Sequence, residues 1–356
     1  MKLAFVVVTY FAERYVVPLL DTLRANTDLT GTVVIVVENA STDGTRALLQ
    51  TQQETWTART GGQLRVLPQD RNTGFAEGCN IGIAEAKRVG VPYVMLLNQD
   101  LELAPGWLPP LLAVMDARPE VAAAQPVIVL HDQPDRLNTA GNAIHFCGFG
   151  FCDRYRAPVA EVLPDPGEVR SVPYASGAAL LLRLAALEKA GAFDERLFLY
   201  HEDCDLQIRL RQVGYDVVVV AASRIAHKYD AGFSARKMAF LERNRWFLLL
   251  KDWPLPRLLA AAPALAGTEL AVLALAAKGG WLRAKLNTYR EIARALPGVL
   301  ADRKVVQARR SSEASDGDYL TGALTFEGFD HPLVTKVANP LLSRYWSFVH
   351  RVLGVA

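Results

Sequence analysis

Acidic residues crowd the short stretch Leu199–Leu210, which reads LYHEDCDLQIRL. Glu202, Asp203 and Asp205 stand where an aromatic run gives way to apolar residues that repeat with helical spacing. Such acids can simply cap the helix, because its amino end favours negative charge. A carboxylate in this place can also act as a general base that accepts a proton from a substrate hydroxyl. For Asp205 we expect the capping role, whereas the residues alone leave both roles open for Asp203.

Polar side chains also follow four expected strands, at the point where each strand ends. Because the carboxyl ends of parallel strands meet at one edge of a sheet, these groups should lie close together. A single polar turn is more often structural, but the coincidence of all of them favours a site for a base, a ribose and a diphosphate. The residues are Thr9 and Tyr10; Glu38, Asn39, Ser41 and Asp43; Asp70, Arg71 and Asn72; and Asn98, Gln99 and Asp100.

A glycine-rich phosphate loop is missing from the first strand-to-helix turn, VVVTYFAER at Val6–Arg14. Phosphate must then be met in another way, and a divalent cation is the obvious candidate. Mg²⁺ and Mn²⁺ take oxygen ligands, and one or two carboxylates commonly hold them together with the substrate's phosphates. Asp100 offers such a carboxylate directly after a buried strand.

The elements that must position these residues alternate between strand and helix over the first ~120 residues. The run LAFVVVTY, residues 3–10, is continuous and β-branched, as in a parallel strand buried on both faces. The same alternation continues to YVMLLNQDLEL, residues 93–103, which we expect to be one strand. The pattern predicts an α/β, Rossmann-like fold with a mostly parallel sheet and helices on both faces. Between Ala124 and Pro173 it gives way to short strands and turns.

The stretch at residues 255–277 has a different character, because it is rich in Ala and Leu and nearly long enough to span a bilayer. Pro263 and Glu269 interrupt it, so we expect a helix that lies on a membrane surface or partly inserts in it. The alternative is a helical hairpin packed on the main domain. The basic segment Arg283–Arg310 that follows points to an anionic surface.

The C-terminal end offers two further features. Gln307–Asp318, reading QARRSSEASDGD, is typical of a mobile loop. Pro340–Gly354 has the spacing of an amphipathic helix, with Tyr345 and Trp346 suited to a membrane interface.

Composition excludes several other classes of protein. With 356 residues and a net charge of +2, the chain suits one large α/β domain with an appendage and is too neutral for a nucleic-acid binder. Its four cysteines form neither a CxxC pair nor a zinc-finger spacing, which favours free thiols in a reducing compartment. The apolar start MKLAFVVVTYF lacks a small-residue cleavage site, so we expect a buried first strand and not a signal peptide.

A series of motifs carries a resemblance to a known family. In chain order these motifs, within Lys2–Trp253, are VVVTYFAERYVVPLLDTL, VVENASTDGT, RNTGFAEGCNIGI, VMLLNQDLELAPGWL, SGAALLLRLAALEKAGAFDERLFLYHEDCDLQIRLRQVGYDVVVV and AHKYDAG. Together they resemble the inverting glycosyltransferases of family 2, and among these the rhamnosyltransferase-like branch. Each motif alone is moderately specific, whereas their order along the chain is a strong signal.

The resemblance implies a GT-A fold over residues 1–253 and a nucleotide-diphosphate sugar donor, linked to dTDP or UDP. It also implies Mg²⁺ or Mn²⁺ as cofactor, held by Asp100 of the NQD motif and by His227. Taken alone, His227 would be read as a satisfied core histidine, because it ends an apolar run. The donor-binding residues that the resemblance implies are Thr9, Tyr10, Glu38, Asn39, Asp70, Arg71, Asn72, Gly74 and Asn98.

The family also has a general base in an acidic pair, here Glu202–Asp203, on the loop that enters the next helix. Inversion is a single displacement at the anomeric carbon, so one carboxylate must take the acceptor's proton while the metal stabilises the leaving diphosphate. We expect Asp203 in this role, kept ionised by the helix dipole, with Glu202 as its substitute. Arg243, Arg245 and Trp246 either approach the diphosphate or acceptor, or lie on a solvated helix face.

Two residues depart from the family pattern. Glu38 stands where the family more often has Asp, which lengthens the side chain near the base. Asn98 replaces the first acid of the family's metal motif, so that Asp100 is the one certain carboxylate there.

The sequence therefore predicts a cytoplasmic, metal-dependent hexosyltransferase, peripheral at the inner face of the plasma membrane. Its acceptor would be a glycan or a polyprenol-linked sugar in envelope polysaccharide assembly, and residues 254–356 would form a helical region that contacts an anionic membrane surface. Two alternatives stay open. One is a nucleotidyltransferase of similar fold, although the glycine-rich basic first loop of that class is missing. The other is a catalytically inactive glycan-binding or scaffold protein.

Overall fold

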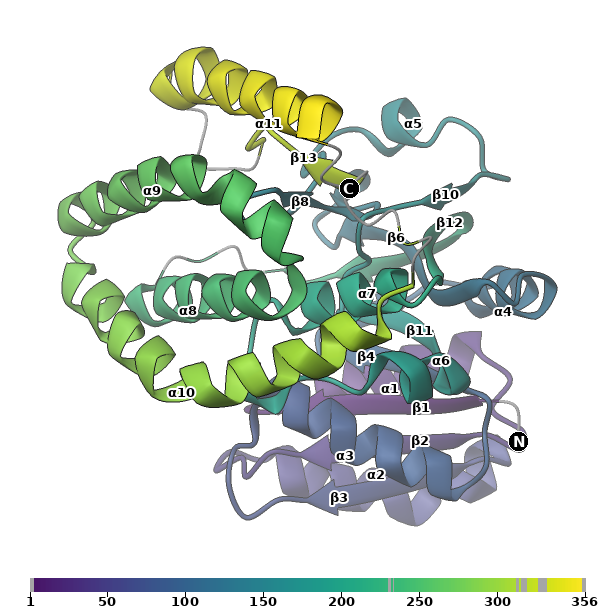
Figure 1. Cartoon of the computed structure of the whole chain (residues 1–356). Helices are drawn as coiled ribbons and strands as arrows, with labels where there is room; N and C mark the ends of the chain where they lie inside the picture. The colour runs from purple at the N-terminus through teal and green to yellow at the C-terminus, as the bar shows by residue number, and fades with distance from the viewer. Residues whose placement is uncertain are drawn as a thin grey trace.

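The computed structural model describes residues 3–229, 232, 234–311, 314, 319–325 and 332–353. A wide sheet with the strand order β10-β12-β6-β11-β4-β1-β2-β3 runs through the molecule, with β5 and β7 attached to β12 and β6. Helices cover both faces of this sheet, and a long helical region lies at one side (Figure 1).

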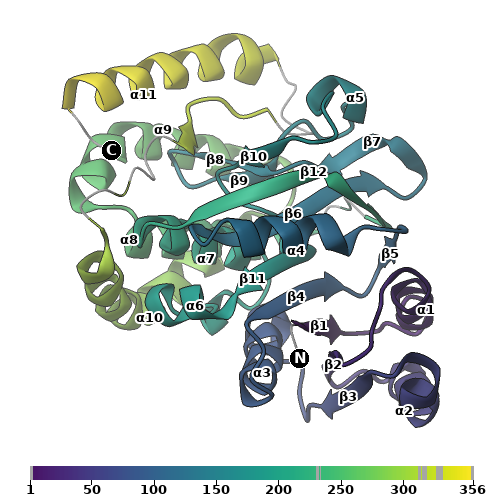
Figure 2. The same ribbon diagram turned by 90° about the vertical axis from the view of Figure 1, so that its right-hand side faces the viewer.

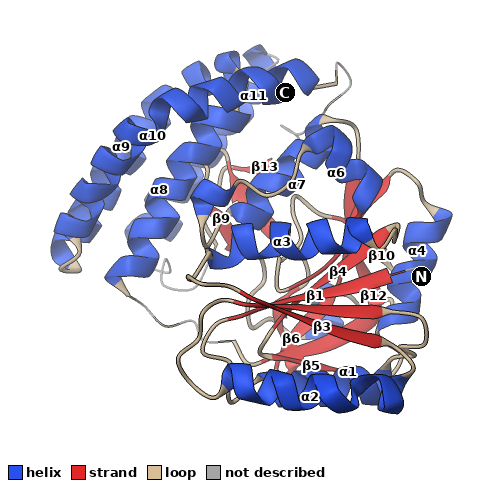
Figure 3. Ribbon diagram, turned by 90° about the horizontal axis from the view of Figure 1, so that it is seen from below, coloured by secondary structure: helices blue, strands red, loops and turns tan. Residues whose placement is uncertain are grey.

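The first half follows the expected alternation. Strands β1 to β4 are parallel, and the helices between them divide over the two faces of the sheet. Helices α1 and α2 pack on the face that carries Phe5 and Val7, whereas α3 packs on the face of Ala4 and Val6 (Figure 3). The bounds are β1 Leu3–Thr9, α1 Val16–Asn26, β2 Val33–Glu38, α2 Thr45–Thr60, β3 Gln63–Pro68, α3 Gly74–Arg88 and β4 Tyr93–Asn98.

The stretch at residues 93–103, which we expected to be one strand, is broken in the structure. Strand β4 ends at Asn98, and after a two-residue turn at Gln99 and Asp100 the short strand β5 (Leu101–Leu103) begins. Strand β5 leaves β4 and pairs with β12 (Asp216–His227) in the antiparallel direction, with Leu101 opposite His227. The break therefore brings Asp100 next to the end of β12.

The second half makes the sheet mixed, because β11 (Ala179–Arg183) lies antiparallel between β4 and β6 (Val121–Leu130). Strands β4, β6 and β12 consequently share one direction. Figure 2 shows α4 on one side of these strands and α6 and α7 beside β11. The remaining bounds are α4 Leu108–Ala117, β7 Gln133–Thr139, β8 Asn142–His145, β9 Gly150–Cys152, α5 Val159–Val162, β10 Val169–Ser171, α6 Leu184–Ala190, the 3₁₀ helix η1 Glu195–Leu197 and α7 Glu202–Gln212.

The C-terminal region is helical and docks on the rest of the chain. Helix α10 packs along α8, while β13 extends the small sheet of β8 and β9 (Figure 1). Trp346 of α11 stacks on Phe146 with 4.9 Å between the ring centroids. The bounds are α8 Ala235–Asp252, α9 Leu255–Lys278, α10 Leu282–Arg309, β13 Leu320–Thr321, the π-helical turn η3 Val334–Ala338 and α11 Asn339–Leu353.

Three expectations for this region change. Trp346 is only 6% exposed, and the hydroxyl of Tyr345 donates to the carbonyl of Ala260, so both face protein and not a membrane interface. Within the basic segment, Lys285 is fully buried and ion-paired. Residues 307–309 of the expected loop belong to α10, and most of its remainder lies outside the described residues.

The structure bears on two further expectations, one for the cysteines and one for the apolar stretch at residues 255–277. All four cysteines are free thiols, and three of them are buried. Within the described ranges, only α9 has both the length and the apolar composition to cross a membrane, and 17% of its most apolar stretch is buried.

Candidate functional site

The carboxyl ends of β1, β2, β3, β4, β6 and β12 lie along one edge of the sheet, as the pairing registers require. Thr9 lies opposite Glu38, Glu38 lies opposite Pro68, and Asn98 lies opposite Val8. His227, the last residue of β12, pairs with Leu130 at the end of β6. The structure thus brings the polar strand ends together at the place where α/β sheets bind ligands.

Glu38 is fully buried, and protein groups occupy its carboxylate. One oxygen accepts a hydrogen bond from the backbone N–H of Ser41 at 2.6 Å, and the other accepts from Arg46 Nε at 2.8 Å. The Arg46 side chain is 46% exposed and is therefore the part of this pair that a ligand would meet. The sequence analysis did not identify Arg46. The pattern that could have indicated it is a basic residue in the first turn of a helix, directly after a turn that carries an acid.

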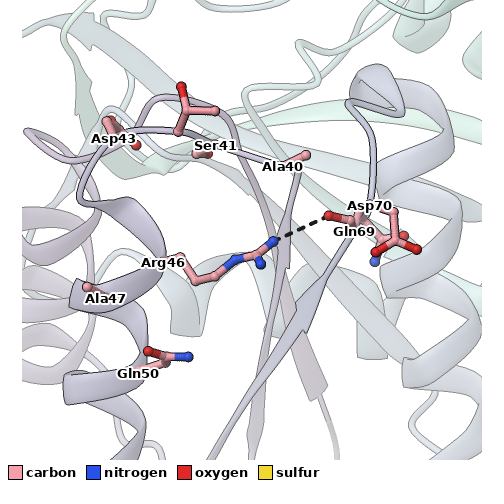
Figure 4. A pocket seen from close by; sticks show the side chains of 9 residues that line it. Ala40, Ser41, Asp43, Arg46, Ala47, Gln50, Gln69 and Asp70 are labelled. Atoms are coloured by element: carbon pink, nitrogen blue, oxygen red, sulfur yellow. Dashed lines mark hydrogen bonds between the residues drawn. The ribbon is translucent and has the colours of Figure 1, made fainter.

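Arg46 lines a cavity of about 570 Å³ between the amino end of α2 and the end of β3. Figure 4 shows its guanidinium reaching toward Gln69, whose carbonyl oxygen accepts a hydrogen bond from Nη2 at 3.3 Å. Asp70, one of the expected donor-binding residues, lines the same cavity. The other lining residues are Ala40, Ser41, Thr42, Asp43, Ala47 and Gln50.

Asn39 is buried and holds the turn that begins α3. Its Oδ1 accepts from the backbone N–H and the hydroxyl of Thr73, at 3.0 and 2.7 Å, and its Nδ2 donates to the carbonyl of Gly74 at 3.0 Å. Asn72 Oδ1 accepts from the N–H of Gly74 at 2.8 Å. Gly74 has φ +81°, and a Cβ there would lie 2.6 Å from the carbonyl oxygen of Phe198. These residues shape the turn and bring it against the segment before α7.

Other expected donor-binding residues lie at the rim of this edge. Tyr10 is exposed, and its ring meets that of Phe11 with the centroids 4.5 Å apart. Arg71 is exposed and pairs with Glu77 at 2.6 Å. Asn98 is partly buried at the end of β4. The rim therefore offers aromatic rings and a cation beside the polar cavity, and sequence reasoning missed Phe11.

Asp100 and His227 face each other, with Asp100 Oδ1 3.1 Å from His227 Nε2. His227 Nδ1 lies 2.8 Å from Asn138 Oδ1. A carboxylate oxygen and an imidazole nitrogen are both ligand atoms that divalent cations accept. Adjacent ligands of an octahedral ion with bonds of about 2.1 Å are about 3 Å apart, so this pair fits Mg²⁺ or Mn²⁺. Asn138 would fix the imidazole as an outer partner of the ligand.

The described part of the chain contains no group of three or more His, Cys, Asp and Glu side chains that could hold a metal. The two-residue set of Asp100 and His227 is nevertheless typical of a cation that completes its coordination with phosphate oxygens of the substrate.

Asp203 lies in the first turn of α7, which begins at Glu202, and not on the preceding loop as we expected. Its Oδ2 accepts from the N–H of Gly177 at 2.9 Å, and its Oδ1 accepts from the N–H of Cys204 at 2.8 Å. The next residue, Ala178, accepts a backbone hydrogen bond from Asn98 at 2.7 Å. Asp203 therefore stands at the same sheet edge as the end of β4.

The two members of the acidic pair differ in their surroundings. Burial raises the pKa of Asp203 despite hydrogen bonds that lower it, in contrast to the ionising effect that we expected from the helix dipole. Glu202 is only 5% exposed, and its Oε2 has no hydrogen-bond partner. Burial, and then the charge of Asp203, raise the pKa of Glu202 well above its usual value. Asp203 is the more accessible carboxylate of the two.

Comparison with known proteins identifies the family. The sequence profile of glycosyl transferase family 2 matches residues 4–190. The chain belongs to this family.

A curated relative agrees with this assignment, and solved structures show the same fold. The chain is 30% identical over 211 residues to N-acetylglucosaminyl-diphospho-decaprenol L-rhamnosyltransferase of Mycobacterium tuberculosis strain H37Rv, a match that covers 54% of this chain and 66% of the relative. S. aureus TarS 1-349 with UDP superimposes with a TM-score of 0.51 at 16% identity, covering 99% of this chain and 91% of that one. GalNAc-T7 with UDP, GalNAc and Mn²⁺ gives a TM-score of 0.57 at 16% identity over 72% and 48% of the two chains. The expected GT-A fold is confirmed.

In this family 2 glycosyltransferase, Asp205 does not cap α7, which corrects our expectation. It is fully buried and accepts from Arg209 Nη2 at 2.7 Å, while Lys251 of α8 contacts its other oxygen. Burial alone would raise the pKa of Asp205, yet the charges of Arg209 and Lys251 hold it below its ordinary value. Asp205 thus ties the helix that carries Asp203 to α8.

The segment that enters α7 is strained, because Phe198, Tyr200 and His201 all have positive φ angles of 60°, 72° and 65°. Asn244 of α8 holds it in place. Asn244 Nδ2 lies within hydrogen-bond distance of the carbonyls of Leu197, Leu199 and Tyr200, at 2.8, 3.0 and 2.7 Å. We name the segment Leu197–His201 the entry segment.

Three further residues of α8, which the sequence offered as candidates, contact other protein groups. Arg243 Nη2 donates to the carbonyls of Arg196 and Leu197, so it supports the entry segment. Arg245 is fully buried in an ion cluster, and Trp246 Nε1 donates to Glu269. These protein contacts correct the alternative of a solvated helix face.

Proposed function

We propose that this chain is an inverting, metal-dependent hexosyltransferase with a dTDP- or UDP-linked sugar as donor, rhamnose being the candidate sugar. The acceptor would be a glycan or a polyprenol-linked sugar in bacterial envelope polysaccharide assembly. The observation that carries the proposal is the grouping of Asp203, with its raised pKa, and the Asp100–His227 pair at one sheet edge of a family 2 glycosyltransferase. The activity that the name of the mycobacterial relative states supports the acceptor class.

In the proposed mechanism Asp203 accepts the proton of the acceptor hydroxyl as that oxygen attacks the anomeric carbon from the face opposite the diphosphate. The N–H groups of Gly177 and Cys204 fix the direction of the carboxylate. A raised pKa makes Asp203 a stronger base than an exposed aspartate. Asp100 and His227 would hold the divalent cation, which supplies charge stabilisation to the leaving diphosphate.

Arg46 is the proposed contact for the nucleobase. With the Glu38 carboxylate already occupied, the donors that the cavity presents come from the guanidinium. Guanidinium N–H groups match the O4 carbonyl oxygen of uracil and thymine, whereas cytosine carries at that position an amino group that is itself a donor. This chemistry supports a dTDP- or UDP-linked donor.

The proposed location is the cytoplasmic face of the plasma membrane, where a polyprenol-linked acceptor would be met. The apolar α9 and the basic residues after it support association with an anionic membrane surface.

The experiment that tests the proposal offers the purified chain a panel of nucleotide sugars, with Mn²⁺ or with a chelator, and measures melting temperature and product formation. A donor ligand that binds only the native state raises its apparent stability. We expect dTDP or UDP sugars to stabilise the protein only with the metal, and to be hydrolysed slowly to nucleoside diphosphate. Release of pyrophosphate would instead identify a nucleotidyltransferase, and absence of donor binding and turnover would identify a scaffold or glycan-binding protein.

A further inference from the structure

Helix α9 has two faces of different character. Its buried residues recur about once per turn along one stripe and pack against the rest of the chain; they are Arg257, Ala261, Leu265, Val272 and Ala276. The opposite face exposes Leu255, Leu259 and Leu270, with exposed alanines between them. Glu269 is the sole charged residue from position 258 to 277. The outer face of α9 is therefore apolar over most of the helix's length.

Glu269 is directed inward into a buried ion cluster that joins α8, α9 and α10. Its carboxylate contacts Arg245 Nη2 at 2.6 Å and Lys285 Nζ at 2.5 Å, and the hydroxyl of Tyr289 donates to it. Arg245 and Lys285 also contact Glu242, at 2.8 and 2.6 Å, which balances two cations with two anions. Burial would raise the pKa of Glu269, yet Arg245 and then Lys285 and Tyr289 hold it below its usual value.

This cluster fixes α9 to the protein. If α9 left its place to cross a bilayer, Arg245 and Lys285 would stay buried with one carboxylate fewer, which is strongly unfavourable. Glu269 would also enter the membrane without its partners. The helix is long enough to span, with 24 residues over about 36 Å, but its inner face is committed to α8 and α10.

We propose that α9 lies flat on an anionic bilayer, with the outer face of Leu255, Leu259 and Leu270 in the lipid and the Glu269 cluster holding its inner face. The proposal rests on the proposed function only for its choice of membrane, the one that carries the acceptor. It joins the two earlier alternatives, since the helix packs on the protein and contacts lipid at once.

Lipid suits this face better than a protein partner does. Interface cores between proteins are enriched in aromatic residues, Met and Arg, and α9 contains no aromatic residue or Met, while its one arginine, Arg257, is buried. Lys278 and Arg283 are exposed at the end of the helix, where they can meet lipid phosphates. Residues 254–356 as a whole carry thirteen Lys and Arg against eight Asp and Glu. Apolar side chains beside excess positive charge are the chemistry that anionic bilayers bind.

The test is flotation of the full chain with vesicles of phosphatidylcholine and phosphatidylglycerol. We expect binding at low salt, weaker binding to vesicles of phosphatidylcholine alone, and complete extraction by alkaline carbonate. The double variant Leu259→Glu, Leu270→Glu should lower the vesicle partition coefficient by about 100-fold or more, because two leucine side chains lose their lipid contact. A matched control, Thr57→Glu with Ala58→Glu on exposed positions of α2, adds the same charge and should float like wild type.

Four outcomes would overturn the proposal. The first two are a wild-type protein that does not float and a double variant that floats like wild type. The other two are resistance to carbonate, which marks a spanning helix, and a wild-type dimer that the double variant abolishes. Melting temperature and donor hydrolysis in vesicle-free buffer should be equal in all three proteins. Loss of donor hydrolysis in every protein would defeat the proposed function, whereas the flotation result would still decide the role of α9.

Discussion

The donor-side edge, formed by the carboxyl ends of β1, β2 and β3, and the entry segment before α7 are held by different kinds of interaction. At the donor-side edge, short polar side chains join neighbouring turns, as where Asn39 binds Thr73 and Glu38 binds Ser41. The entry segment has three residues in left-handed conformations, and Asn244 and Arg243 of a distant helix support it. Contacts between neighbouring turns therefore hold the donor-side edge, whereas the entry segment depends on contacts with α8.

We therefore expect donor affinity to depend on the donor-side edge and catalytic geometry to depend on the entry segment. Substitutions at the donor-side edge should change donor binding with little effect on turnover at saturation. Substitutions that reach the entry segment or the first turn of α7 should change turnover or stability and leave donor affinity nearly as it is.

The largest effect is expected for Asp203→Asn. The amide keeps the shape of the carboxylate but cannot accept the acceptor's proton, and loss of a general base costs about 10²–10⁴-fold in rate. Transfer rate, donor affinity and melting temperature should be measured together, and only the first should move. Glu202→Gln is the control, since its carboxyl is buried and burial raises its pKa well above the ordinary value. Equal transfer rates in wild type and Asp203→Asn would move the base role to Glu202.

The pH profile sharpens the same assignment. A base must be ionised, so activity is present above the pKa of Asp203 and is lost as pH falls through it. Because burial raises that pKa, the acid limb of kcat/KM should lie above the ordinary aspartate value of 3.8. An acid limb at or below that value, measured with enzyme shown to stay folded, would contradict the role of burial at Asp203.

The next effect concerns Asn138, which lies outside both regions and supports His227. Asn138→Ala removes the partner that orients the imidazole, and the loss of such outer partners typically lowers metal affinity by about 10–100-fold. Titration of donor binding with Mn²⁺ measures it, with Asn80→Ala, remote from the metal pair, as the control. Identical Mn²⁺ dependence in Asn138→Ala and wild type would remove His227 from the metal site.

Asn244→Ala tests the entry segment. Its side chain serves three backbone carbonyls, and leaving buried acceptors unpaired costs about 1–3 kcal/mol. We expect lower stability by chemical denaturation and a lower kcat, with the KM for the donor unchanged. A raised donor KM with normal kcat would show that the two regions are not separable in this way.

The smallest effect is expected at the donor-side edge itself. Arg46→Lys keeps the charge beside Glu38 but loses the planar guanidinium, which should weaken uridine or thymidine diphosphate binding by about tenfold. Calorimetry with UDP, dTDP and CDP measures this, and Arg59→Lys on the exposed end of α2 is the control. Unchanged preference for UDP over CDP would exclude Arg46 as the residue that contacts the base.

The sequence was sufficient to predict the position of site residues that directly follow the end of a strand. Each βα turn of the parallel half follows an apolar strand of the expected alternation, so the grouping of Thr9, Glu38, Asn98 and Asp100 could be predicted from the direction of the strands. The break between β4 and β5 could not be predicted, because it depends on pairing with β12, which lies more than a hundred residues further along the chain.

The buried ion pairs that hold the helices around the site were also harder to predict, because they too depend on residues far apart in the chain. Arg245 and Lys285 looked like solvated or lipid-facing cations, because sequence does not show that Glu242 and Glu269 come from other turns and helices to neutralise them. The capping prediction for Asp205 was wrong because Lys251, nearly fifty residues later, offers it a buried ion pair. Glu242 and Arg245 are a local pair on one helix, but the pairs with Glu269, Lys285 and Lys251 join separate helices and leave no local pattern.

The free thiols have a practical consequence for handling this protein. Burial raises the pKa of all four cysteines, with Cys147 and Cys152 at about 12, so at neutral pH they are present as thiols and not as reactive thiolates. Maleimide reagents and mild oxidants should therefore modify the folded chain slowly. A single cysteine placed on the outer face of α9 would be labelled selectively without removal of the native four, which gives a fluorescent reporter of lipid contact in the otherwise unaltered enzyme.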